Sequence, residues 1–441
     1  MGVVIMVNVA SIFSTLGNPN SLIPLAIKDS ASTAGMTAGS YITGKEEGHD
    51  RFIDEVGTEV IWLGGIPFFK WLFDKTAFNA MGLDSKFDAR NLRNKDILNK
   101  IKEYAPTEDL RKNIEKISKK QKLFKNTATA KFFVSTALTV ASYIGLTKFK
   151  QNYTEKKIRQ NLINEYEQEK KNKELNNDKN QTKNLSFKGL GSAIESLAFS
   201  PVKNMWVLDG CITGERLKDS RTKQEFIGYA IKEASILCFM YYAGGKIQEK
   251  LEKEAMKRHN KSIALDARVL EDDFLRKAFE DGSIIKSIED FKLAKESDVK
   301  LYEFLHKNPD NLIVKTAKMS DTISMYKEPQ GLFKKSKVTD KIDTRKYIDL
   351  DEVKNINKNI ETLYNQYKEA VMKGETSKDF FAKVKKLKRN SILTNIGSCI
   401  FALAILTPSI MLLRRYMSND NQEFETKKQI RDQLIKEGVI A

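Results

Sequence analysis

The sequence predicts a mainly α-helical membrane protein: a duplicated helical membrane unit with transmembrane and interfacial helices plus a helical soluble insertion. Three observations predict this class. They are a long uncharged segment near the C-terminus, a second apolar segment in the first half of the chain, and four short matches between the halves. Hydrophobic residues make up 41% and charged residues 30% of the 441 positions. The class therefore depends on how the apolar residues are distributed.

The clearest apolar segment is Asn390 to Leu413, which contains no ionisable residue. A helix rises about 1.5 Å per residue and the hydrocarbon core of a bilayer is about 30 Å thick, so the segment is long enough to span. The basic stretches "KVKKLKR" before it and "RR" after it are typical of anchors at the two headgroup layers. We predict a transmembrane helix over 390–413, which Pro408 kinks or ends. The alternative is a central helix of a large soluble core.

A second apolar segment, Asn126 to Lys150, is uncharged only between Phe132 and Thr147. It predicts a transmembrane helix over 127–147, provided that Lys131 extends its ammonium group to the membrane interface. Basic residues flank both apolar segments on both sides, so the positive-inside rule gives no orientation.

Four short matches occur in the same order in both halves of the chain, which indicates a duplication. Each match is short, so chance similarity is the alternative. The distance between matched segments only increases along the chain, as insertions in the second copy would cause. The matches pair "ITGKEE" at Ile42 with "ITGERL" at Ile212, "RFIDEVGTEVIWL" at Arg51 with "EFIGYAIKEASIL" at Glu225, "GLDSKF" at Gly82 with "ALDARV" at Ala264, and the apolar segments at Asn126 and Asn390.

These matches divide the chain into five parts. They are an apolar or interfacial N-terminal segment at 1–35, a first repeat at 36–150, a polar linker at 151–188, a second repeat at 189–416 with a soluble helical insertion at about 270–350, and a polar C-terminal tail at 417–441.

The stretch "VTDKIDTRKYIDLDEVK" near the end of the insertion predicts a short strand pair or a loop before a helix that starts near Asp351.

The stretch "GSYITGKE" from Gly39 resembles the start of a phosphate-binding P-loop, but Glu46 occupies the position of the hydroxyl that would hold Mg²⁺. No apolar strand precedes it, and the second copy replaces the lysine by Glu215. We therefore interpret Gly44 and Gly214 as the turn of the repeat that leads into a helix.

A short apolar segment with a glutamate follows this turn in each half, which makes Glu59 and Glu233 candidate functional carboxylates. Ionisable residues in short apolar segments at matching places are typical of transporter substrate sites. An amphipathic helix in the headgroup layer or against a partner helix explains the same pattern.

The charge balance predicts an anionic partner, because 75 Lys and Arg against 58 Asp and Glu give a net charge of +17. The lysines flank apolar segments or dot helical faces, and there is no Arg-rich tract with interleaved aromatics. We expect the bilayer and anionic lipid headgroups as partners, with a homo-oligomer or a protein partner as a further expectation; nucleic acid is disfavoured.

No pattern of catalytic, cofactor-binding or metal-binding residues is present in the sequence. The three cysteines and the three histidines are scattered, and there is no nucleophile elbow, HExxH motif or dinucleotide fingerprint. We expect that the protein is not an enzyme and that it binds no cofactor and no metal ion.

The sequence thus predicts a basic, non-enzymatic integral membrane protein that acts as a scaffold or binds a partner. Its use of Lys and Asn suggests an AT-rich genome, from which we expect a bacterial inner (cytoplasmic) membrane. One alternative is an oligomeric transporter- or channel-like protein that uses the glutamate-containing segments. The other is a membrane-associated nucleic-acid binder.

Overall fold

A computed structural model describes residues 9–18, 21–169, 200–328, 336–417 and 425–440 of the protein. The described chain is mainly helical, which confirms the predicted all-α character. It divides into two units, and each unit is assembled from three separate segments. Unit 1 comprises 1–24, 74–130 and 245–396, and unit 2 comprises 25–73, 131–244 and 397–441.

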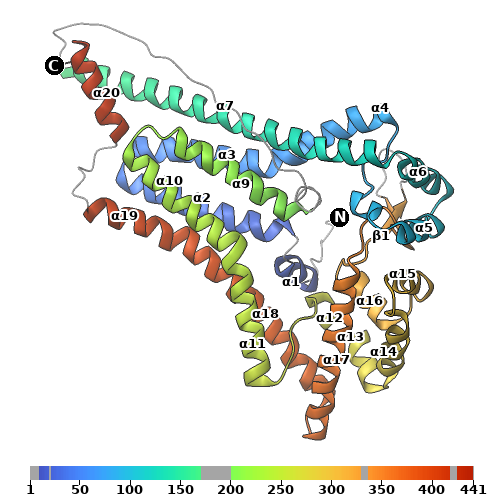
Figure 1. The fold of residues 1–441 in the computed structure, drawn as a ribbon. Coiled ribbons are helices and arrows are strands. Elements are labelled where there is room, and N and C mark those ends of the chain that lie inside the picture. Colours follow the sequence, from blue (N-terminus) through green and yellow to red (C-terminus); the bar gives the residue numbers. More distant parts are fainter. Residues whose placement is uncertain (1–8, 19–20, 170–199, 329–335, 418–424, 441) are drawn as a thin grey trace, which may run out of the picture. The chain divides into compact units, whose positions relative to one another are not determined.

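Unit 2 contains two helical hairpins and parts of two long helices, after residue 130 in one and after residue 396 in the other (Figure 1). Side-chain caps set two of the starts: Ser200 accepts from the backbone N–H of Lys203 at 3.3 Å, and Thr222 from that of Glu225 at 3.0 Å. The elements are α2 (Leu22–Thr43), α3 (Lys45–Phe73), the later part of α7 (Gln121–Glu169), α9 (Pro201–Lys218), α10 (Lys223–Ile236), the π-helical turn η3 (Leu237–Tyr242), η4 (Ala402–Leu406), α19 (Thr407–Met417) and α20 (Glu425–Lys436).

The predicted C-terminal span is helical throughout, with a π-helical turn, η4, just before Pro408. The wider turn accommodates the missing N–H of the proline, and the Thr407 hydroxyl donates to the Ala402 carbonyl at 2.8 Å. Helix α2 lies directly against this turn, because a Cβ at Gly35 would lie only 2.1 Å from the Ala404 carbonyl oxygen. Gly35 is therefore required for this close approach.

The described residues of unit 1 form helices and an antiparallel strand pair, and the interior includes a cluster of aromatic rings around Phe279, Tyr367 and Phe381. The elements are α1 (Val9–Gly17), η1 (Asp74–Phe78), α4 (Asn79–Met81), η2 (Ala89–Leu92), α5 (Lys95–Glu103), α6 (Glu108–Lys119), α11 (Ala243–His259), α12 (Ala267–Glu271), α13 (Asp273–Glu280), α14 (Ser283–Ala294), α15 (Asp298–Lys307), α16 (Leu312–Met319), β1 (Met325–Glu328), β2 (Lys337–Ile342), α17 (Leu350–Met372) and α18 (Ser377–Phe401).

A capping turn with the pattern D-x-R-x-x-x-[D/N] occurs three times in unit 1. In each turn the aspartate accepts from the backbone N–H and the side chain of the arginine two residues on, and the last residue caps the next helix. The residue before each aspartate is buried. The turns start at Asp88, Asp266 and Asp343, with N–H distances of 2.9, 2.8 and 3.1 Å, and their last residues Asn94, Asp272 and Asp349 cap α5, α13 and α17.

Several predicted boundaries need correction. The segment at 151–188, expected to be a polar linker or an extension of the preceding helix, continues α7 up to residue 169; the remainder lies outside the described residues. The C-terminal tail contains α20, whose Ile430 and Leu434 pack on Ile158 and Leu162 of α7. The two repeats do not form separate bodies, since each half of the chain contributes to both units.

Other predicted segments have the following structure. The described residues of the segment at about 270–350 form helices and the strand pair β1–β2, and α17 starts at Leu350. The N-terminal segment contains α1, whose Ser14 donates to Asp266 at 2.8 Å; residues 1–8 lie outside the described residues. The match that was placed at Gly82 and Ala264 is better placed on the capping turns at Asp88 and Asp266.

A histidine in unit 1 makes its stability depend on pH. His306 lies between Tyr104 and Tyr302, with ring centroids 4.5 and 4.9 Å away, and burial, aided by nearby Lys318, lowers its pKa from 6.5 to about 4. Between these values the unfolded chain binds more protons than the folded chain, so stability falls as pH falls from 6.5 to 4. We predict a loss of about 1–3 kcal/mol from this group.

Thermal unfolding of the full chain between pH 7 and pH 5 measures this effect. The matched variant His306→Phe keeps an aromatic ring against Tyr104 and should lose less stability over the same interval. Equal losses in the two proteins would assign the pH dependence to other groups.

Candidate functional site

The interior of unit 2 contains a network of five acidic and five basic side chains. Four helices and one loop supply them, and the five charges of each sign balance. The network consists of Asp50, Arg51, Asp54 and Glu55 of α3, Lys150 of α7, Arg216 of α9, Arg221 of the α9–α10 loop, and Glu225, Lys232 and Glu233 of α10. Most of these side chains are almost fully buried.

Arg216 joins three other helices through its guanidinium group. It forms an ion pair with Glu233 of α10 and donates to the Thr58 hydroxyl of α3 at 2.9 Å. Its Nε donates to the Tyr143 hydroxyl of α7 at 3.1 Å, and its Nη2 lies 3.4 Å from the Asp54 carboxylate. All sides of this planar donor are therefore used, which suits arginine better than lysine.

Lys150 is the second centre and is only 1% exposed. Its ammonium donates to the Tyr229 hydroxyl at 2.9 Å and lies 3.7 to 3.8 Å from Asp54, Asp50 and Glu225. The Tyr229 hydroxyl in turn donates to Asp54 at 3.1 Å. This lysine looked like a flank of the apolar segment in the sequence, yet it points into the network.

The remaining pairs close the two ends of the network. At one end Arg221 lies 2.7 Å from Asp50 and 2.9 Å from Glu225. At the other end Lys232 pairs with Glu55 and lies 3.6 Å from Glu233.

A buried ion network of this kind is stable only when it is complete. Transfer of each charge from water costs several kcal/mol, and the partners offset that cost when the geometry is good. Removal of one member leaves an uncompensated charge and costs about 3–5 kcal/mol. The network therefore fixes the register and packing of α3, α7, α9 and α10.

The outer surface of unit 2 has the opposite character. Among the described residues, two helices are long and apolar enough to cross a membrane, Gln121–Tyr166 and the α18–η4–α19 stretch at Ser377–Met417. Only 33% and 28% of their most apolar 18-residue windows are buried. The large apolar side chains exposed on the unit 2 parts of these helices include Phe133, Val134, Leu138, Phe149, Phe401, Ile405, Leu406, Ile410 and Leu413.

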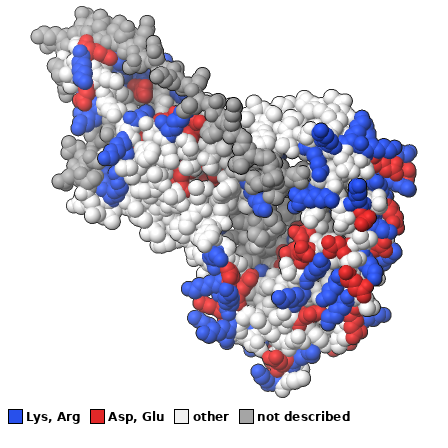
Figure 2. Space-filling model, in the orientation of Figure 1, with Lys and Arg blue, Asp and Glu red and all other residues white. Residues whose placement is uncertain are grey.

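The surface charges follow the same division. Figure 2 shows a wide uncharged surface over α2, α10 and α19, whereas Lys, Arg, Asp and Glu crowd the part that carries α5, α6 and α14–α16. In the described part of unit 2, the ten charged side chains of the network thus lie in the interior, whereas large apolar side chains of α7, η4 and α19 are exposed.

The structure places the two predicted carboxylates in different surroundings. Glu233 is buried in the network, where it also accepts from the Thr213 hydroxyl at 3.1 Å. Glu59 is partly exposed and accepts from Ser30 instead. Glu55, one turn earlier on α3, is the glutamate of this helix that joins the network, through its ion pair with Lys232.

The two predicted turn glycines also differ. Gly44 lies at the junction of α2 and α3, and its N–H donates to the Ser40 carbonyl at 3.2 Å. Gly214 lies inside α9, so the prediction of a turn there is wrong. The matched residues "ITGER" therefore lie within α9, and Arg216 of this helix joins the network.

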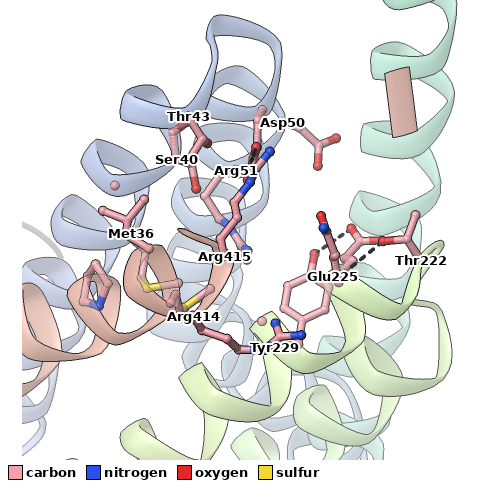
Figure 3. A pocket seen from close by; sticks show the side chains of 17 residues that line it. Met36, Ser40, Thr43, Asp50, Arg51, Thr222, Glu225, Tyr229, Arg414 and Arg415 are labelled. Atoms are coloured by element: carbon pink, nitrogen blue, oxygen red, sulfur yellow. Dashed lines mark hydrogen bonds and ion pairs between the residues drawn. The ribbon is translucent and has the colours of Figure 1, made fainter. Parts of the chain in front are cut away.

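A cavity of about 100 Å³ adjoins the network between α2, α10 and α19 (Figure 3). Met36, Pro408, Met411 and Leu412 form its apolar side. Its polar side consists of Ser40, Thr43, Glu47, Asp50, Arg51, Thr222, Gln224, Glu225, Tyr229, Arg414 and Arg415.

Among the described residues no group of three or more His, Cys, Asp or Glu side chains could hold a metal ion. Comparison of the chain with family models, with curated proteins and with solved structures finds no match.

The central role of Arg216 predicts a large stability effect. Arg216→Leu leaves Glu233 and Asp54 short of a cation, and we expect a loss of about 3–5 kcal/mol in the free energy of unfolding. In the double variant Arg216→Leu/Glu233→Leu one uncompensated carboxylate is also removed. It should be more stable than Arg216→Leu alone.

Thermal unfolding in detergent micelles compares these variants. Lys223→Leu serves as the control, since Lys223 is exposed on α10 and should change stability little. A melting temperature of Arg216→Leu equal to that of the wild type would contradict the network's structural role.

Proposed function

We propose that the chain is an integral membrane protein of non-enzymatic scaffold or partner-binding type, with unit 2 in the bilayer and unit 1 in water. The observation that carries this proposal is that unit 2 buries an ion network and exposes large apolar side chains on α7, η4 and α19. In water that arrangement opposes the hydrophobic effect, because it exposes Phe and Leu and desolvates Arg and Lys. In a bilayer it is the expected arrangement.

The exposure of the two apolar helices argues against the alternative of a soluble core. A core helix would bury most of its apolar residues, whereas about two thirds of each apolar window lies on the surface of the chain. Arg414 and Arg415 follow the apolar stretch of α19 and suit the headgroup layer. A bacterial inner membrane remains part of the proposal on composition alone.

Duplication of an ancestral unit is a further part of the proposal. The first half of the chain passes from unit 2 to unit 1 after residue 73 and returns after 130; the second half does so after 244 and after 396. In each half a helical hairpin, a π-helical turn, a D-x-R capping turn and a long apolar helix follow one another in that order. This shared order supports duplication more strongly than the short sequence matches do.

Unit 1 is proposed to bind the partner. Its basic side chains are numerous on the face drawn in Figure 2, among acidic ones, and would contact anionic lipid headgroups or an acidic protein surface. A homo-oligomer is a further part of the proposal.

Alkaline carbonate extraction tests the membrane assignment. We predict that the protein stays in the membrane pellet at pH 11, because the exposed side chains of α7 and α19 hold it by apolar burial and not by charge. Release into the supernatant would show that unit 2 is covered by protein or is soluble.

A transporter- or channel-like function is the second candidate, favoured by ionisable residues buried inside a proposed membrane unit. It predicts that Glu233→Gln abolishes uptake or ion-dependent stabilisation in proteoliposomes. Glu59→Gln, outside the network, serves as the matched variant. Uptake or stabilisation that survives in Glu233→Gln would leave the network with a structural role alone.

A further inference from the structure

The cavity between α2, α10 and α19 combines an apolar side with charged groups at one end of an apolar helix. Met36 of α2 and Pro408, Met411 and Leu412 of α19 line the apolar side. Gly228 keeps the α10 side open, because a Cβ there would lie 3.2 Å from the Met411 methyl carbon. Such a cavity suits an amphiphile better than a fully polar ligand.

Three guanidinium groups and three carboxylates line the polar side, so the lining carries no excess charge. Most of these groups already have partners. Arg415 pairs with Glu47 at 2.5 Å, Glu225 lies 2.9 Å from Arg221, and Arg51 lies 3.4 Å from Glu55.

Two groups of the lining have hydrogen-bonding capacity that no described residue uses. Arg414 makes no hydrogen bond or ion pair with any described residue, although it is only partly exposed. Asp50 is 6% exposed, and its Oδ2 accepts from Arg221 at 2.7 Å. Its buried Oδ1 has no hydrogen-bond partner among the described residues. Because Asp50 also lines the cavity, a bound ligand can supply the donor that this oxygen lacks.

The two groups, Arg414 and Asp50, bind ligand groups of opposite charge. A guanidinium binds a phosphate through charge-assisted hydrogen bonds, and a carboxylate oxygen accepts from an ammonium, which has three donors. A balanced lining favours a zwitterion over an anion, because neither charge of the ligand is left without a counterpart.

We propose that this cavity binds the phosphoethanolamine headgroup of a glycerophospholipid, with the phosphate at Arg414, the ammonium at Asp50 and the acyl chains along the apolar side. The assignment rests on the proposed membrane function, since Arg414 follows the apolar stretch of α19 at the level where headgroups would lie. It narrows the partner from anionic lipids in general to one zwitterionic headgroup.

Thermal unfolding of the purified full chain in detergent micelles tests this site. Phosphatidylethanolamine should raise the melting temperature more than phosphatidylglycerol, which lacks the ammonium, or phosphatidylcholine, whose ammonium has no N–H donor. Arg414→Gln should weaken the apparent affinity for phosphatidylethanolamine roughly tenfold or more and leave the melting temperature without lipid unchanged. The control Lys148→Gln removes an exposed cation of α7 outside the cavity and should behave as the wild type.

Each other outcome overturns the assignment in a distinct way. Equal stabilisation by the three lipids would mean that no headgroup is selected. Stabilisation by soluble O-phosphoethanolamine as strong as that by the lipid would assign the site to a free phosphoamine. A chain that resists carbonate extraction but shows no lipid preference would end this proposal and leave the membrane function intact.

Discussion

The buried guanidinium of Arg216 is the constraint on which unit 2 depends. It needs Glu233 of α10, Asp54 and Thr58 of α3 and Tyr143 of α7 at the same time. Lys150 imposes a similar demand on α3 and α10 from the side of α7. Because a missing partner leaves a charge in a low-dielectric interior, the four helices can pack in only one register.

The same constraint explains why the apolar surface lies outside. Helices that turn their ionisable residues toward one another present their Phe, Leu and Ile side chains outward, as on the exposed face of α7 and α19. A bilayer stabilises that arrangement for two reasons. Its acyl chains cover the apolar face, and no water competes for the ion pairs. The cavity at Arg414 adjoins the end of the network that holds Asp50 and Glu225, where the interior meets the proposed headgroup layer.

Local sequence patterns predicted the helices better than they predicted which side chains contact one another in the folded chain. The apolar run at 390–413 and the polar helical pattern that begins near residue 270 follow from composition over one segment; the first is helical, and α13 to α16 form in the second. Glu233 was found because a charge interrupts an apolar segment. Arg216 and Lys150 were missed because their roles come from side chains far away in the sequence. Gly214 was misread because a glycine that opens a turn and one inside a helix look alike without the neighbouring helix.

The division into two units was also beyond local reasoning. Each half of the chain alternates between the units, so sequence order and spatial proximity differ. The recurring D-x-R capping turn was visible in the letters at Asp88, Asp266 and Asp343, but its meaning depends on the arginine folding back onto the aspartate.

Spin-label accessibility on the exposed face of α7 and η4 tests the central claim most directly. Single cysteines placed at Val134 and Leu406, in a chain whose three native cysteines are replaced, would carry the label in liposomes. If these faces contact lipid, collisions with oxygen should exceed collisions with a polar nickel complex at both positions, because oxygen concentrates in the hydrocarbon core. Greater access to the nickel complex, or little access to either reagent, would place the face in water or against protein and contradict the account.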